Sequence, residues 1–121
     1  MFTVTKRMEI SAGHQLDLPY DSPCRRLHGH NWIVIVTVQG LKLNEQGMLI
    51  DFGRLKQIVH GQLDHRNITG IIPGNPTAEN VAYWIAEQID TELGGKQYWT
   101  DTRVVRVQVQ ESEGNEAIWE R

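Results

Sequence analysis

The sequence predicts a single α+β domain in which an antiparallel sheet carries two helices on one face. Three segments with strand periodicity precede two consecutive segments with helical periodicity, and two further strand-like segments follow. Because the strands come in adjacent pairs around the two helices, we infer antiparallel pairing. The chain has 121 residues, of which 40% are hydrophobic and 22% charged, and therefore fits one folded domain over residues 1–121.

The first predicted strand covers residues 2–10, where apolar side chains alternate with polar ones. Its apolar side chains are Phe2, Val4, Met8 and Ile10. His14 follows close behind this strand. Residues 15–27 contain two prolines together with aspartate and serine, which predicts a loop that is long for a small domain. Loops of this length are often functional.

The second predicted strand covers residues 30–40, which are rich in β-branched side chains on both parities. This pattern is typical of a strand with both faces at least partly covered, and Gly40 closes it. Residues 47–52, with the sequence GMLIDF, form a short third strand. The residues from Asn44 to Gly47 would then be the loop of an antiparallel hairpin between the two strands.

The first helix begins after Asp51, whose side chain can cap it, and ends near Asp64 and His65. Its apolar face is made by Phe52, Leu55, Ile58, Val59 and Leu63. His60 also falls on this helix, without other histidines nearby in the sequence, and we interpret it as a solvated surface residue.

The second helix is marked more clearly than the first, with Pro76 and Thr77 as a start signal and Gly94 and Gly95 as a stop signal. Its apolar stripe is made by Ala78, Val81, Ala82, Ile85, Ile89 and Leu93. Residues 102–111 then alternate as a strand, and residues 116–121 could add a last short strand.

Glu111 shares its parity in the strand 102–111 with Val105, Val107 and Val109, so its carboxylate should face the covered side. A charge in that position needs a partner. A carboxylate accepts two parallel hydrogen bonds, which matches the ring N–H and the exocyclic amino group on the edge of a pterin or guanine. The alternative is that the strand ends before Glu111 and that the side chain is solvated.

Three histidines indicate a metal site. His28 and His30 are two residues apart at the head of a strand, which turns both imidazoles to the same side, and His14 would come close if the first two strands pair. Three neutral imidazoles leave one tetrahedral position free on zinc, which is typical of a catalytic site. Gly29 allows close approach of the backbone. The alternative is that each histidine is an ordinary polar or core residue.

Cys24 and the pair Asp64 and His65 are the other candidates for catalysis. Cys24 lies four residues before His28 and beside Arg25 and Arg26, so its thiol could act as a base or nucleophile. The alternative for a lone cysteine is a small buried packing residue. The Asp64 carboxylate could orient the His65 imidazole for proton transfer, provided that the helix ends there.

The composition argues against two classes of partner. A net charge of −3 gives no general attraction for a nucleic-acid backbone or an anionic membrane. No apolar run approaches the roughly 20 residues that cross a bilayer, and the first ten residues carry charges where a signal peptide is apolar. The single cysteine suits a reducing compartment. We therefore expect a cytoplasmic protein.

Six segments carry a resemblance to a known family. In chain order they read SAGHQL, CRRLHGHNW, IDFGRLK, LDHRN, NPTAEN and VQES. Together they resemble the 6-pyruvoyltetrahydropterin synthase and 6-carboxytetrahydropterin synthase family over almost the whole chain. The resemblance implies the T-fold, an antiparallel four-stranded sheet with two helices packed on one face. It also implies a homo-oligomer, a trimer or a hexamer.

The resemblance further implies roles for individual residues. The Zn²⁺ ligands would be His14, His28 and His30. The catalytic residues would be Cys24 as the base, with Asp64 and His65 as its proton-transfer partners. The pterin would be bound by Glu111 and Thr77.

The reaction implied by the resemblance is that of a zinc-dependent lyase acting on 7,8-dihydroneopterin triphosphate. The products would be 6-carboxy-5,6,7,8-tetrahydropterin, acetaldehyde and triphosphate, in the biosynthesis of queuosine and related deazapurines. One alternative is a 6-pyruvoyltetrahydropterin synthase, which keeps the three-carbon side chain. Another is a non-catalytic, metal-containing protein that binds a pterin or purine.

Overall fold

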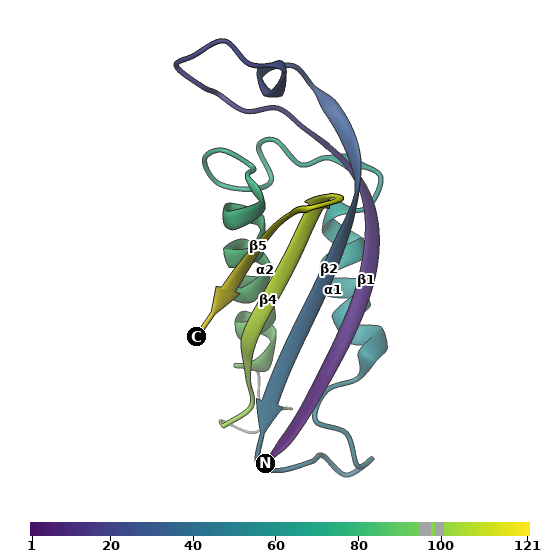
Figure 1. Ribbon diagram of the computed structural model, residues 1–121. Coiled ribbons are helices and arrows are strands. Elements are labelled where there is room, and N and C mark those ends of the chain that lie inside the picture. Colours follow the sequence, from purple (N-terminus) through teal and green to yellow (C-terminus); the bar gives the residue numbers. More distant parts are fainter. Residues whose placement is uncertain (95–97, 99–100) are drawn as a thin grey trace.

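The structure, a computed structural model, describes residues 1–94, 98 and 101–121 (Figure 1). Within these residues the chain forms five strands, two α-helices and one short 3-10 helix. In chain order they are β1 (Phe2–His14), η1 (Pro23–Arg25), β2 (His28–Gly40), α1 (Phe52–Leu63), β3 (Arg66–Asn67), α2 (Ala78–Leu93), β4 (Arg103–Ser112) and β5 (Asn115–Glu120).

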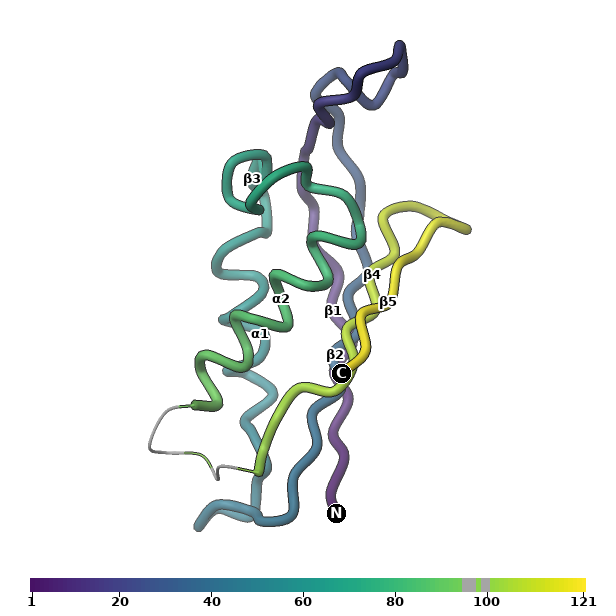
Figure 2. Tube along the Cα trace, turned by 90° about the vertical axis from the view of Figure 1, so that its left-hand side faces the viewer, coloured from purple at the N-terminus to yellow at the C-terminus, as the bar shows by residue number. Residues whose placement is uncertain are grey.

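The strands form one sheet with the order β3-β1-β2-β4-β5. The four long strands pair with antiparallel neighbours, as predicted. The two-residue strand β3 adds a fifth, parallel member at the edge of β1. Seen along the sheet, both helices lie on the same side of it (Figure 2). The predicted α+β class is therefore confirmed, with five strands rather than four.

The register of β1 against β2 decides which residues share a face. Each even-numbered residue of β1 lies opposite an even-numbered residue of β2, and His14 is the Cα partner of His28. The even positions face the helices and are the buried ones over most of both strands. His14, which we expected just after the strand, is the last residue of β1, on the same parity as Met8 and Ile10.

The predicted third strand, GMLIDF, is wrong, and so is the hairpin that it was to form. Residues 47–51 have no strand structure, and β2 pairs with β1 and β4. The Asn44 side chain accepts the N–H groups of Gln46 and Met48, which holds this segment in a turn. Leu49 and Ile50 are buried nonetheless, so their hydrophobicity serves core packing in a loop.

Strand β4 contains an irregularity that the sequence pattern did not reveal. Its register against β2 shifts between Thr37 and Val38, and Val105 has no Cα partner in the ladder. A bulge of this kind inserts one residue and changes the parity. Val104 is therefore fully buried, whereas the predicted Val105 is only partly buried.

Both helices are confirmed with nearly the predicted limits. The Asp51 carboxylate accepts the N–H of Gly53 at 2.7 Å, and the Thr77 hydroxyl accepts the N–H of Asn80 at 3.2 Å. Helix α2 ends at Gly94, whereas Gly95 lies outside the described residues. Four of the five predicted side chains of α1 are buried, and Phe52 is exposed. No helix in the described part of the chain is long and apolar enough to span a membrane.

Candidate active site

Three histidines meet where β1 ends and β2 begins. His14 closes β1, and His28 and His30 open β2 on the same face of the sheet. The distances between their ring centroids are 4.6 Å for His14 and His28, 5.2 Å for His14 and His30, and 4.9 Å for His28 and His30. One ring nitrogen from each residue lies within 4.8 Å of the other two. The three side chains could therefore hold a metal ion.

Backbone carbonyl groups fix the tautomers of two of these rings. The Nδ1 atom of His14 lies 2.8 Å from the carbonyl oxygen of Pro76, and Nδ1 of His28 lies 2.6 Å from that of Arg26. A carbonyl only accepts, so each Nδ1 must carry the hydrogen and donate it. The Nε2 atom of each neutral ring then keeps its lone pair free, which is how metal-binding histidines are oriented.

The surroundings of His14 favour a neutral imidazole. Burial lowers the pKa of His14, against the opposing effects of the Pro76 carbonyl and the Glu111 charge. Trp32 packs edge-on against His14 and His30 and donates its Nε1–H to the carbonyl of Ala12. Nε2 of His14 and Nε2 of His30 are buried and have no hydrogen-bond partner among the described residues. Buried, unpartnered imidazole nitrogens suit a transition dication such as zinc.

The lowered pKa of His14 predicts how the stability of the metal-free protein depends on pH. In the folded chain the pKa lies below 6.5, so from pH 6.5 downward the unfolded chain takes up a proton that the folded chain does not. The free energy of unfolding should then fall with decreasing pH, by at most about 1.4 kcal/mol per pH unit for this proton. Urea unfolding of the metal-free protein between pH 7.5 and 5.5 measures this pH dependence. In His14→Gln the free energy of unfolding should change less with pH. An unchanged dependence on pH would show that His14 is not its source.

Glu111 lies against the histidines. Strand β4 continues to Ser112, so the alternative of a solvated Glu111 beyond the strand end is wrong. Its Oε1 atom is 3.3 Å from Nε2 of His30, and its Oε2 atom is 3.9 Å from Nε2 of His14. A register shift between Gln110 and Ser112 places the residue at a bulge, which redirects side chains. The sequence alone did not indicate this contact, because it depends on the pairing of β2 with β4.

Cys24 lies in η1, within the long excursion between β1 and β2 that extends beyond the helices in Figure 1. Its backbone N–H donates to the Ser22 hydroxyl, and its carbonyl accepts the N–H of Leu16. The side chain is partly buried. Within the described residues, no hydrogen bond joins the Cys24 thiol to the histidine cluster.

Asp64 and His65 lie on the outer edge of β1. Asp64 caps the end of α1, so the helix ends there, as an interaction between the Asp64 and His65 side chains requires. Its Oδ1 atom accepts the N–H of Ser11 at 2.9 Å, and the N–H of His65 donates to the Ser11 carbonyl at 2.6 Å. The His65 ring is 83% exposed and its Nε2 atom is 3.7 Å from Oδ2 of Asp64. The structure thus joins this pair to β1, and His65 lines the same cavity as His28.

The sequence led us to expect that His60 is a solvated surface residue, and this expectation is wrong. It is partly buried, and its Nδ1 atom lies 3.6 Å from Oδ2 of Asp64, one helical turn away. The N–H of Ser11 lowers the pKa of Asp64, and the charges of His65 and His60 add to this effect. The spacing of four residues was the available signal for this contact.

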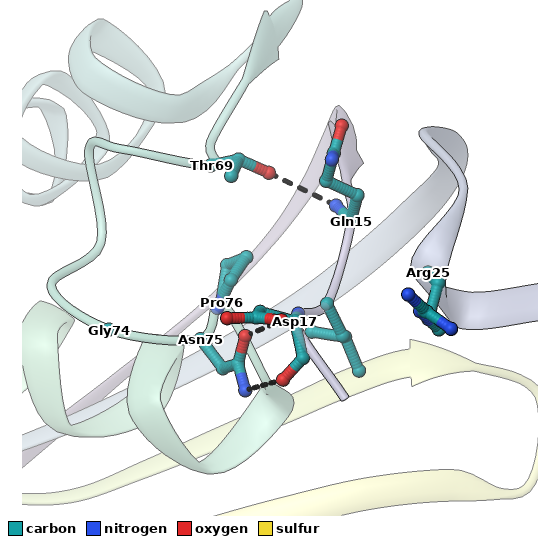
Figure 3. Close-up of a pocket in the computed structure, with 8 residues that line it drawn as sticks. Gln15, Asp17, Arg25, Thr69, Gly74, Asn75 and Pro76 are labelled. Carbon is teal, nitrogen blue, oxygen red and sulfur yellow. Dashed lines mark hydrogen bonds between the residues drawn. The ribbon is translucent and has the colours of Figure 1, made fainter. Parts of the chain in front are cut away.

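A pocket of about 660 Å³ lies beside the cluster (Figure 3). Its wall includes Pro76, whose carbonyl binds His14, and the guanidinium of Arg25 lies across it. Asn75 exchanges two hydrogen bonds with the backbone of Asp17, and these contacts join the two loops that line the pocket. A cavity of this size next to the candidate metal site, with polar side chains in its wall, offers room for a ligand.

The comparison with known proteins identifies the family. The profile of the 6-pyruvoyl tetrahydropterin synthase family matches residues 3–121. The chain belongs to this family. The structure of 6-pyruvoyl tetrahydropterin synthase from Caenorhabditis elegans shares the fold, with a TM-score of 0.73 and 23% identity over 99% of this chain and 95% of that one.

Curated relatives in this family carry two kinds of name. The 6-carboxy-5,6,7,8-tetrahydropterin synthase of Rickettsia bellii is 29% identical over 86% of this chain and 91% of its own. The enzyme of the same name from Bacillus subtilis is 42% identical over 53% of this chain, which spans 44% of that relative. The dihydroneopterin monophosphate aldolase of Pyrococcus furiosus is 41% identical over 91% of this chain and 88% of its own.

Membership in the 6-pyruvoyl tetrahydropterin synthase family supports a lyase that acts on pterins. Within one chain, the structure brings Glu111 to His14 and His30. It places Cys24 in the loop before β2, and it places Asp64 and His65 at the β3 edge of the sheet. Thr77 caps α2 directly after Pro76, whose carbonyl holds His14.

Proposed function

We propose that the chain is a zinc-dependent lyase that converts 7,8-dihydroneopterin triphosphate to 6-carboxy-5,6,7,8-tetrahydropterin, acetaldehyde and triphosphate. The observation that carries this proposal is the convergence of three imidazoles, two of which have buried Nε2 atoms without a hydrogen-bond partner in the described part of the chain. The names of the relatives from Rickettsia bellii and Bacillus subtilis support the choice of reaction. Biosynthesis of queuosine and related deazapurines is the pathway that we propose for the product.

The metal would be held by His14, His28 and His30, and zinc fits a donor set of neutral imidazoles. When bound, it would supply a Lewis acid that lowers the pKa of hydroxyl groups on the substrate side chain. The backbone carbonyls of Pro76 and Arg26 support this role, because they hold two of the rings with Nε2 facing the site.

We assign the proton transfers to Cys24, Asp64 and His65. Cys24 removes protons as the base, and His65 returns them. Asp64 stays ionised because the N–H of Ser11 lowers its pKa, and its carboxylate orients the His65 ring. Glu111 anchors the edge of the pterin, and Thr77 is a further pterin contact.

We also propose that the protein is a homo-oligomer, a trimer or a hexamer, in the cytoplasm. The exposed positions of β1 alternate along the face of the sheet away from the helices. The outer edge of β5 has no partner strand among the described residues. Exposed sheet edges in a small domain favour pairing with further copies.

The proposed reaction is tested by its products. The zinc-loaded protein should release one acetaldehyde for each triphosphate from 7,8-dihydroneopterin triphosphate, measured by enzymatic aldehyde assay and by mass spectrometry of the pterin. The control is the protein after removal of its metal by a chelator, which should release neither. Formation of a pyruvoyl pterin without acetaldehyde would reject the carboxytetrahydropterin reaction in favour of the 6-pyruvoyltetrahydropterin synthase.

A second candidate function is that of an aldolase acting on dihydroneopterin monophosphate. The identity of 41% to the aldolase of Pyrococcus furiosus over 91% of this chain favours it. The two candidates differ in the phosphate chain of the substrate, so kcat/KM for the monophosphate and for the triphosphate should be compared with the same preparation. Preference for the monophosphate together with loss of the side chain as an aldehyde would select the aldolase.

A further inference from the structure

The carboxylate of Glu111 faces a nitrogen of His14 that has no hydrogen to donate to it. Nδ1 of His14 gives its hydrogen to the Pro76 carbonyl, so Nε2 of the neutral ring carries a lone pair. Oε2 of Glu111 lies 3.9 Å from this atom. Two acceptors that face each other in a buried site repel, and a cation between them removes the repulsion. The orientation of Glu111 is therefore the one that a metal ligand needs.

The distance to His30 supports the same conclusion. Oε1 of Glu111 is 3.3 Å from Nε2 of His30, and this nitrogen has no hydrogen-bond partner among the described residues. In a tetrahedral zinc site, bonds of about 2.0–2.2 Å place neighbouring donor atoms roughly 3.3–3.5 Å apart. The carboxylate oxygen and the imidazole nitrogen thus have the spacing of two ligands of one ion.

The backbone around Glu111 directs the side chain into the site. The ladder between β4 and β5 shifts register between Gln110 and Ser112, and Glu111 is the residue without a Cα partner there. A bulge re-aims the side chain of its extra residue and is often found next to an active site. The side chain is 26% exposed, so it also has room to leave the metal.

We propose that Glu111 is the fourth ligand of the metal in the substrate-free protein and that it leaves the metal when a pterin binds. The second part rests on the proposed function, in which the same carboxylate takes the edge of the pterin. In the substrate-free protein Glu111 would occupy the fourth coordination position, so that this position opens only when the substrate binds. Substrate hydroxyls then reach the metal only in a complex where Glu111 is already bound to the ring.

The affinity of the metal-free protein for Zn²⁺ tests the first part. We expect Glu111→Gln to weaken Zn²⁺ binding by at least about 10- to 100-fold, the range for loss of a group that only supports a metal site. Glu113→Gln is the matched control, because it removes an exposed carboxylate from the same hairpin, and its affinity should equal that of the unchanged protein. Competition with a chromophoric chelator measures all three. Glu111→Gln within twofold of the unchanged protein would overturn the proposal.

A spectroscopic experiment tests the exchange and keeps it separate from the proposed reaction. With Co²⁺ in place of zinc, 7,8-dihydroneopterin should change the visible spectrum of the unchanged protein, and Glu111→Gln should show an altered spectrum before any pterin is added. If Glu111→Gln loses pterin affinity with an unaltered Co²⁺ spectrum, the ligand proposal fails while the pterin anchor stands. Glu111→Asp keeps the charge, and its Zn²⁺ affinity should lie between those of the unchanged protein and Glu111→Gln, provided circular dichroism confirms its fold.

Discussion

Replacement of Cys24 by serine is expected to lower kcat by about 10²- to 10⁴-fold, the range for loss of a general acid–base group, while the protein keeps its metal. Serine has nearly the same shape, but its hydroxyl is a far weaker acid than a thiol. The contacts that hold Cys24 in η1 come from its backbone, through Leu16 and the Ser22 hydroxyl, and survive the change. The metal would be held by His14, His28 and His30, a group that does not include Cys24.

Turnover of the pterin substrate and zinc content of the same preparation measure this prediction. Ser22→Ala is the matched control, because it removes the hydroxyl that accepts the Cys24 N–H and leaves the thiol in place. Ser22→Ala should lower kcat much less than Cys24→Ser does. A Cys24→Ser protein that keeps half of its turnover would show that the thiol is not the base. Pterin binding without any turnover in the unchanged protein would instead favour the non-catalytic binder.

The parts of the fold that were predictable are those set by local periodicity. The alternation of Met8 and Ile10 and the stripe of α2 each depend on neighbours within one element, and both are confirmed. The segment GMLIDF shows the limit of this reasoning. Its apolar residues, Leu49 and Ile50, are buried by the core without forming a strand, because the Asn44 side chain holds the preceding turn.

The candidate site was predictable where two ligands share one strand. The spacing of His28 and His30 already places both rings on one face, and the pairing of β1 with β2 then adds His14. The contact of Glu111 with His30 could not be derived in this way, because it needs the pairing of β2 with β4 and a bulge. The contact of His60 with Asp64 was missed because His60 was interpreted from the lack of nearby histidines, and not from the carboxylate four residues further along the chain.

Replacement of His28 by glutamine is expected to abolish retention of zinc during dialysis, and with it the turnover of the pterin. The loss of one of three imidazoles should weaken binding by more than about 100-fold, the upper end for loss of a group that only supports a metal site. The stabilisation of the folded chain by zinc should fall by at least about 2.7 kcal/mol, because each tenfold change in Kd is worth about 1.4 kcal/mol. Zinc content and the shift of Tm on adding zinc measure these effects.

His60→Gln is the matched control for this loss of metal. It removes an imidazole that contacts Asp64 and lies outside the cluster of His14, His28 and His30. Zinc content and the zinc-dependent shift of Tm should therefore remain as in the unchanged protein. Full zinc content in His28→Gln would mean that the ion binds elsewhere, and the buried Nε2 atoms of His14 and His30 would then need another partner. Removal of His28 leaves the hydrogen bond between His14 and the Pro76 carbonyl in place. A loss of zinc would therefore reflect the loss of the His28 ligand and not a change in the fold around it.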